Sequence, residues 1–150
     1  MKDLTEQKRL AERKARADIM ALENTLREIG STREENPDLV PTTHYFAPGV
    51  YAREIFMPAD TVLTGAIHKT EHLNILSQGK VTVASGGESI TLTAPHTFVS
   101  PVGTKRAIYS HEDSTWTTIH VTDLTDPDEI VEEITVDSFE ELDEMMQGRK

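Results

Sequence analysis

The spacing of apolar residues along the chain first indicates a helix. Residues 3–29 contain no Gly or Pro and consist mainly of Ala, Leu, Glu, Lys and Arg, which are strong helix formers. Apolar side chains recur there at intervals of seven, in two overlapping series: Ala15, Leu22 and Ile29, and Ile19 with Leu26. This seam covers about two heptads, fewer than the roughly three to four that indicate a coiled coil. We therefore predict one long amphipathic helix within residues 1–30, which ends at Gly30 and Ser31.

The pattern then changes to short strands. Residues 31–43 are rich in Ser, Thr, Pro and charge and are predicted to form a linker. Over residues 44–122, runs rich in Thr, Val and Ile alternate with turn signals such as Gly86-Gly87. The predicted strands are Val50–Met57, Thr61–Lys69, His72–Ser77, Lys80–Ala84, Ser89–Thr93, Thr97–Ser100, Arg106–Tyr109 and Thr115–Thr122. Such spacing indicates a mainly β fold, either a sandwich or a jelly roll, between which the pattern alone does not choose.

Residues 123–150 form an acidic extension. From Asp123 to Gly148 there are eleven acidic residues and no Lys or Arg. The apolar residues between Pro127 and Val136 predict an additional edge strand. Ser138 is a suitable N-cap for a last helix, with Glu141 completing a capping box. Four side chains lie at spacings of three and four on one face of that helix: Phe139, Leu142, Met145 and Met146.

Composition narrows the function classes. The chain has 150 residues, a formal net charge of −11 and no Cys, so we expect one domain with extensions and no disulfides. No apolar run approaches the roughly 20 residues that span a bilayer, and the charged N-terminus lacks the apolar segment of a signal peptide. So acidic a chain disfavours general nucleic-acid binding, because phosphate contacts need Lys and Arg. We expect a cytoplasmic location and no membrane contact.

The candidate chemistry is centred on the stretch from Gly65 to Gly79. It places His68 and His72 four residues apart, followed after six residues by Gly79. This resembles the first motif of the cupin superfamily, which reads roughly Gly, five residues, His-x-His, three or four residues, Glu, six residues, Gly. His72 then falls at the glutamate position, His68 at the second histidine and Ala66 at the first. The resemblance implies a single small double-sheet jelly-roll barrel over residues 44–122.

The second cupin motif is also recognisable. It reads roughly Gly, five residues, Pro-x-Gly, two residues, His, three residues, Asn, and Pro101-Val-Gly103 matches its Pro-x-Gly. Arg106 then stands at the histidine position and Ser110 at the asparagine. Since arginine stays protonated and is not an ordinary metal ligand, two of the four ligand positions that the family uses, Ala66 and Arg106, are non-ligating here.

Several interpretations of these residues stay open. In cupins, the motif residues converge on one divalent transition metal ion; here His68 and His72 would do so, with His120 on the last strand as a replacement ligand. Alternatively, the histidines are hydrogen-bonded and hold no metal, or a metal uses other ligands. Arg106, with Lys105, is also a candidate for holding a small anion. The competing interpretation of Arg106 is an ion pair with a buried carboxylate such as Glu71 or Glu54.

The residues of both motifs further resemble those of small, mostly uncharacterised cupins encoded by tailed bacteriophages and prophages. The resemblance implies a phage setting, in the host cytoplasm or a virion. Because Ala66 and Arg106 are non-ligating, we favour a non-enzymatic binding or structural protein, with a metal-dependent dioxygenase, isomerase or lyase as the alternative and a metal-free anion-binding barrel as a second one.

Two kinds of partner are expected. One is a second copy of the chain, in a homo-oligomer that pairs edge strands. The other is a further phage protein that docks on the two terminal helices, unless both helices pack on their own barrel. The candidate contact residues are Ile19, Leu22, Leu26, Ile29, Phe139, Leu142, Met145 and Met146.

Overall fold

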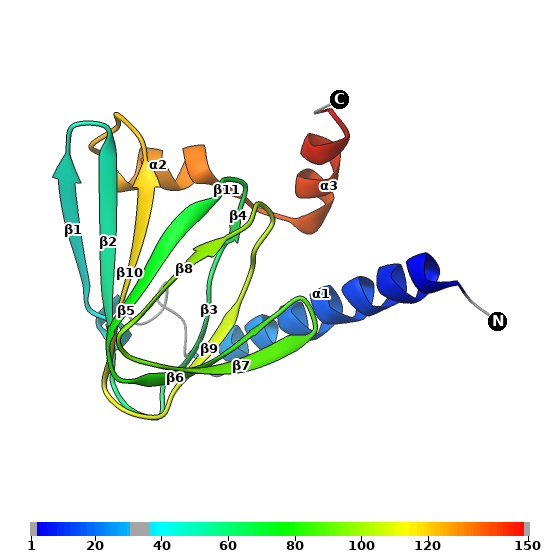
Figure 1. The fold of residues 1–150 in the computed structure, drawn as a ribbon, viewed down its shortest axis with the longest axis horizontal. Coiled ribbons are helices and arrows are strands. Elements are labelled where there is room, and N and C mark those ends of the chain that lie inside the picture. Colours follow the sequence, from blue (N-terminus) through cyan, green and yellow to red (C-terminus); the bar gives the residue numbers. More distant parts are fainter. Residues whose placement is uncertain (1–2, 31–36, 149–150) are drawn as a thin grey trace.

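Two antiparallel sheets face each other in the computed structural model, which describes residues 3–30 and 37–148. The larger sheet has the strand order β1-β2-β10-β5-β8, the smaller one β3-β9-β6-β7, and β4 pairs with β11 in a separate ladder (Figure 1). The strands are β1 (Thr42–Ala47), β2 (Val50–Met57), β3 (Val62–Thr64), β4 (Ile67–His68), β5 (His72–Gln78), β6 (Lys80–Ser85), β7 (Glu88–Thr93), β8 (His96–Ser100), β9 (Ala107–Ser110), β10 (Ser114–Val121) and β11 (Thr135–Val136). The helices are α1 (Leu4–Glu28), α2 (Pro127–Ile134) and α3 (Phe139–Gln147).

This is the mainly β jelly roll that the sequence predicts, and every predicted strand of the central region is present. One of them, Thr61–Lys69, is divided into β3 and β4, which belong to different ladders. The expectation of a closed barrel is wrong. Within the described residues, no strand pairing joins the two main sheets. The predicted linker falls partly outside these residues, and Thr42 already begins strand β1.

The core lies between the sheets and follows from the two-residue alternation of the strands. Trp116 of β10, Leu76 of β5 and Met57 of β2 are fully buried and meet Val81 of β6 from the opposite sheet. Each such side chain contributes about 1.5–3 kcal/mol through removal from water. Because the same alternation puts Trp116, Thr118 and His120 on one face of β10, the core and the polar interior share one strand.

Helix α1 matches the predicted helix closely. Asp3 caps it by accepting a hydrogen bond from the Glu6 amide at 2.7 Å. Its first half is exposed and projects beyond the sheets (Figure 1), while its second half packs near β3. There Lys105 donates to Glu23 Oε1 and to the Gly65 carbonyl, both at 2.9 Å. No helix of the described residues is long and apolar enough to cross a bilayer.

The segment after β10 differs from the prediction. The edge strand expected between Pro127 and Val136 is wrong: Pro127–Ile134 is helix α2, followed by the two-residue strand β11. Asp126 caps this helix, Pro127 occupies its first turn, and Ile130 and Ile134 are buried four residues apart against Tyr51. The spacing of Ile130 and Ile134 is therefore that of one face of a helix.

Helix α3 confirms the predicted N-cap. Ser138 Oγ accepts from the Glu141 amide at 3.1 Å, whereas the Glu141 carboxylate accepts from the Asp137 amide rather than from Ser138. Arg16 of α1 bonds Asp143 at 2.9 Å and lies 4.6 Å from the centre of the Phe139 ring. Leu142 is buried. The two terminal helices thus contact each other and their own barrel.

Candidate metal centre

Three histidines from separate strands lie close together between the sheets. His68 ends β4, His72 begins β5 and His120 lies near the end of β10. The ring centroids are 4.4 Å apart for His68 and His72, 4.7 Å for His72 and His120, and 5.6 Å for His68 and His120. One nitrogen from each ring lies within 4.8 Å of the other two. The histidines that the sequence proposed as one site are therefore brought together.

The backbone explains this convergence. His120 shares the inner face of β10 with Trp116, and β10 is the direct neighbour of β5. Strand β11 pairs Thr135 with His68, while the Thr104 carbonyl accepts from the His68 amide at 3.0 Å. His68 is half-buried, and the other two are buried. Each ring is consequently held by a different part of the chain.

Two of the imidazoles present a buried nitrogen without a partner. His72 Nδ1 lies 3.2 Å from the Thr70 carbonyl, so it is the protonated nitrogen and Nε2 carries the lone pair. His72 Nε2 and His120 Nδ1 are both buried with no hydrogen bond. A metal-ligating histidine ordinarily donates its second ring N–H to a carbonyl or carboxylate, which is the arrangement of His72. The donor set therefore fits a metal ion.

The protonation state fits as well. Burial, together with His72, His120 and Arg106, lowers the pKa of His68 to about 3. Burial and the neighbouring His72 lower the pKa of His120 to about 4. The pKa of His72 is lowered by burial and by Arg106, against the opposing effect of the Thr70 carbonyl. All three rings are neutral at pH 7, and a neutral imidazole is the form that binds metal.

Tyr51 positions His120 from the other side and was not anticipated from the sequence. Its ring stacks on His120 with centroids 6.2 Å apart, and its hydroxyl lies 2.6 Å from His44 Nδ1. Tyr51 pairs with His120 across β2 and β10. Helix α2 covers Tyr51 through Ile130 and Ile134. This end of the sheets is thus closed by the helix that the sequence had suggested to be a strand.

Arg106 is buried beside the histidines. Its guanidinium donates to Asn74 Oδ1 at 3.2 Å and to Ser100 Oγ, and it lies over the rings of Phe98 and Trp116. No ion pair joins Arg106 to a carboxylate among the described residues, so the expected pairing with Glu71 or Glu54 is not observed. Burial lowers the Arg106 pKa to about 10, which leaves the group charged at pH 7.

Lys105 does not join this site. Its ammonium points to helix α1, where it is paired with Glu23. Asn74, by contrast, was missed in the sequence although it contacts both Arg106 and Trp116. It lies two residues after His72, on the same face of β5, and this alternation was the available signal.

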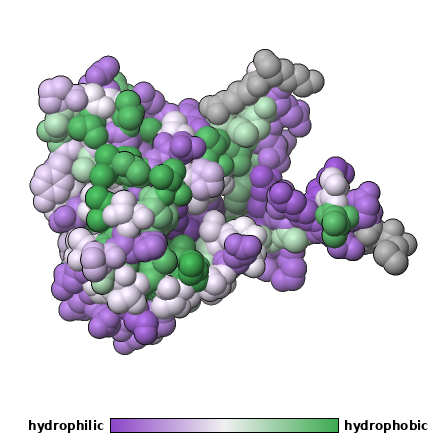
Figure 2. Space-filling model, viewed as in Figure 1, coloured by the Kyte–Doolittle hydropathy of each residue, from purple (hydrophilic) through white to green (hydrophobic). Residues whose placement is uncertain are grey.

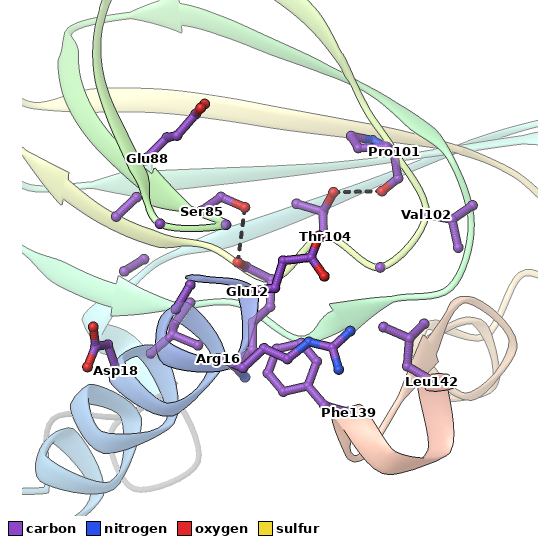
Figure 3. A pocket seen from close by; sticks show the side chains of 18 of the residues that line it. Glu12, Arg16, Asp18, Ser85, Glu88, Pro101, Val102, Thr104, Phe139 and Leu142 are labelled. Carbon is purple, nitrogen blue, oxygen red and sulfur yellow. Dashed lines mark hydrogen bonds between the residues drawn. The ribbon is translucent and has the colours of Figure 1, made fainter. Parts of the chain in front are cut away.

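A pocket on the molecule is separate from the histidines. It has a volume of about 650 Å³ and lies between α1, α3, the β6–β7 hairpin and the loop from Pro101 to Thr104 (Figure 3). Its lining includes five of the predicted contact residues: Ile19, Leu22, Phe139, Leu142 and Met146. A second pocket of about 330 Å³ lies between α1 and β11 and is lined by Leu26. Neither pocket is lined by a histidine of the cluster.

The two facing antiparallel sheets have the fold of solved cupin structures, as the sequence motifs predicted. Solved structures of this fold resemble the chain. KdgF from Halomonas sp. is 19% identical, with a TM-score of 0.50 over 59% of this chain and 82% of that one. A putative ethanolamine utilization protein Q from Salmonella typhimurium LT2 is 12% identical, with a TM-score of 0.50 over 59% and 74%.

The cupin domain of Schizosaccharomyces pombe Cnp3 is 20% identical, with a TM-score of 0.49; the match covers 57% of this chain and 66% of that one. No family model and no curated protein matches the sequence. At these identities the similarity concerns the fold, so the function must be argued from the site itself.

Proposed function

We propose that this cupin holds one divalent transition metal ion on His68, His72 and His120. The observation that carries the proposal is the pair of buried nitrogens, His72 Nε2 and His120 Nδ1, which have no hydrogen-bond partner. A buried polar atom without a partner costs about 1–3 kcal/mol, and coordination of a ring nitrogen that carries the lone pair would remove that cost. His68 supplies a third nitrogen within 4.8 Å of the others.

The chemistry of the donor set limits the ion. Imidazole nitrogens suit zinc, iron, nickel and copper better than magnesium or calcium. Three protein ligands leave coordination positions open, as in catalytic rather than structural zinc sites. A bound ion would act as a Lewis acid toward a small molecule. His68, His72 and His120 would hold it, while Thr70 and Tyr51 orient two of the rings.

Metal analysis tests this proposal. After reconstitution with Zn²⁺ and removal of excess metal, we expect about one ion per chain, and loss of bound metal in His68→Ala/His72→Ala. Removing two ligands should weaken affinity by more than the roughly 10–100-fold typical of second-shell changes. His96→Ala is the matched control, because His96 is exposed at the start of β8. A reconstituted wild-type protein without metal would overturn the proposal.

A second candidate function is a binding or structural role within a homo-oligomer or a larger assembly. The observation that favours it is an exposed apolar row on the outer face of the larger sheet, which includes Tyr45, Leu73 and Val99. Contiguous exposed apolar surface of this kind marks interaction sites. The expectation of a phage or virion partner rests on the sequence resemblance alone. Both roles are compatible, because the row and the histidines lie on opposite faces of the sheet.

A further inference from the structure

Binding of a metal ion would leave the interior with an excess of positive charge. Arg106 is 7% exposed and charged, and among the described residues no carboxylate pairs with it. The three imidazoles are neutral, and the metal-ligand group found here contains no carboxylate. A divalent ion would therefore bring two further positive charges into a site that has no negative one. Buried charges are ordinarily paired.

The metal ligands and the arginine network adjoin each other. His72 pairs with Ser100 across β5 and β8, and Ser100 Oγ accepts from Arg106. Asn74, the next residue on the same face of β5, accepts from Arg106 as well. The positive charge of Arg106 also lowers the pKa of both His68 and His72. A metal ion on these rings and the guanidinium would thus repel each other.

One further atom indicates what relieves this repulsion. Arg106 Nε is buried and has no hydrogen-bond partner. It is an N–H donor, so a metal ion cannot satisfy it, whereas an anionic oxygen can. The interior therefore leaves an unsatisfied acceptor on His72, an unpartnered ring nitrogen on His120 and one unsatisfied donor on Arg106. Asn74, Ser100 and the rings of Phe98 and Trp116 hold the guanidinium in place.

We propose that a small carboxylate anion binds together with the metal and is held by Arg106, so that metal and carboxylate bind cooperatively. This inference rests on the proposed metal site and names its ligand class. A compact carboxylate has two oxygens, one available to an open metal position and one to the guanidinium.

The test measures the affinity of metal-free protein for Co²⁺ by titration in chloride buffer, with and without saturating formate or acetate. Coupling between two sites is typically 5–150-fold, and we expect the carboxylate to raise Co²⁺ affinity by about 10-fold or more. By reciprocity, Co²⁺ should raise the affinity for the carboxylate by the same factor. The absorption spectrum of bound Co²⁺ should also change when the carboxylate is added.

Two variants assign the effect to Arg106. Arg106→Met removes the charge at similar length, and we expect tighter Co²⁺ binding without anion together with loss of the coupling. Arg106→Lys keeps the charge and should retain part of the coupling, which covers the case in which the Met variant does not fold. Lys69→Met, beside His68 but outside the network, is the control and should retain the wild-type coupling.

The outcomes separate the two proposals. If Co²⁺ binds with equal affinity in chloride and in formate, the inference is wrong while the metal site stands. Coupling with phosphate but not with formate or acetate would overturn the assignment to carboxylates. Failure of the wild-type protein to bind any metal would overturn both.

Discussion

At the scale of single residues, the histidine cluster combines three groups that resist protonation. Burial is the main cause at each, and Arg106 adds its positive charge at His68 and His72. Without a metal, such a cluster lowers stability in acid, because the unfolded chain accepts protons that the folded interior excludes. The site therefore keeps its rings neutral at the expense of acid tolerance.

We expect the metal-free protein to lose stability as the pH falls below about 6.5, the ordinary pKa of histidine. Since the folded pKa of His68 is about 3 and that of His120 about 4, their stabilisation is complete above 6.5 and declines between 6.5 and those values. Each such group changes the free energy of unfolding by at most about 1.4 kcal/mol per pH unit. Urea unfolding at pH 7.5, 6.5 and 5.5, with chelator present, measures the slope.

The variant His68→Gln separates this effect from carboxylate titrations. It should reduce the slope between pH 6.5 and 5.5, whereas His96→Gln, at an exposed position, should not. Identical slopes for the wild type and His68→Gln would contradict the assignment.

At the scale of elements, the connection between β5 and β6 is one of the places where the chain crosses from the larger to the smaller sheet. Gly79 alone makes this connection, with φ of +93°. A Cβ there would lie 2.5 Å from the Asp113 carbonyl oxygen and 2.7 Å from the Ser114 Cα. Both are backbone atoms and cannot move away freely. The turn before β10 thus packs directly on the crossing, and only glycine fits.

Gly79→Ala should therefore destabilise the fold by more than backbone strain alone, about 2–4 kcal/mol from the combined left-handed φ and overpacking. Gly86→Ala in the β6–β7 turn is the matched control, because it has φ of +61° but nothing within 4 Å of its added Cβ. It should cost only about 1 kcal/mol. Chemical denaturation compares the free energies of unfolding of the two variants. Equal losses would show that the close approach of Ser114 does not add to the destabilisation.

Helices and strands were predictable where the spacing of apolar residues agreed with the turn and cap residues at their ends. The hairpin turn Gly86-Gly87 and the Ser138 cap are examples, whereas β1 was missed because it is a mostly exposed edge strand directly after Pro41. Helix α2 was misassigned because Ile130, Val131 and Ile134 suit either structure over a short run. The Asp126-Pro127 pair was the deciding signal, since Asp is favoured as N-cap and Pro in the first turn.

The site was predictable only in part. The first motif identified His68 and His72, and His120 was added because it lies on the predicted last strand. The partners of Arg106 could not be read in the same way. Asn74 and Ser100 are 26 residues apart, and Asn74 meets Trp116 only after their strands have paired. A buried arginine without a carboxylate is a property of that assembled interior, not of any local stretch.

At the scale of the whole molecule, the outer face of the larger sheet carries almost no charge. Its strand pairs align one row across five strands: Tyr45, Ala52, Ile119, Leu73 and Val99. Val121, in the adjacent row, is 89% exposed. Glu54 is the only charged residue among the outward positions of these strands, in a chain of net charge −11. Figure 2 shows apolar surface in the left half of the view, where Figure 1 places this sheet.

We expect a second copy of the chain to cover this face. An acidic chain can approach itself most readily through its uncharged surface, since repulsion between the acidic extensions is then weakest. Five strands about 4.8 Å apart and roughly 25 Å long present about 600 Å² in projection, comparable to the roughly 800 Å² per partner of a stable interface. The homo-oligomer predicted from the sequence would then join sheet faces rather than edge strands.

The double substitution Leu73→Lys/Val99→Lys should convert the dimer to a monomer, because it places two paired, unsatisfied charges at the centre of the proposed interface. Both side chains are already largely exposed, so folding should be preserved. Ile90→Lys is the control: Ile90 is 60% exposed, but on β7 of the other sheet. Sedimentation equilibrium at micromolar concentration gives the mass of each variant. A monomeric wild-type protein would contradict the predicted dimer. A dimer that survives the double substitution would assign the contact to the edge strands instead, because pairing there uses backbone groups that these side chains do not supply.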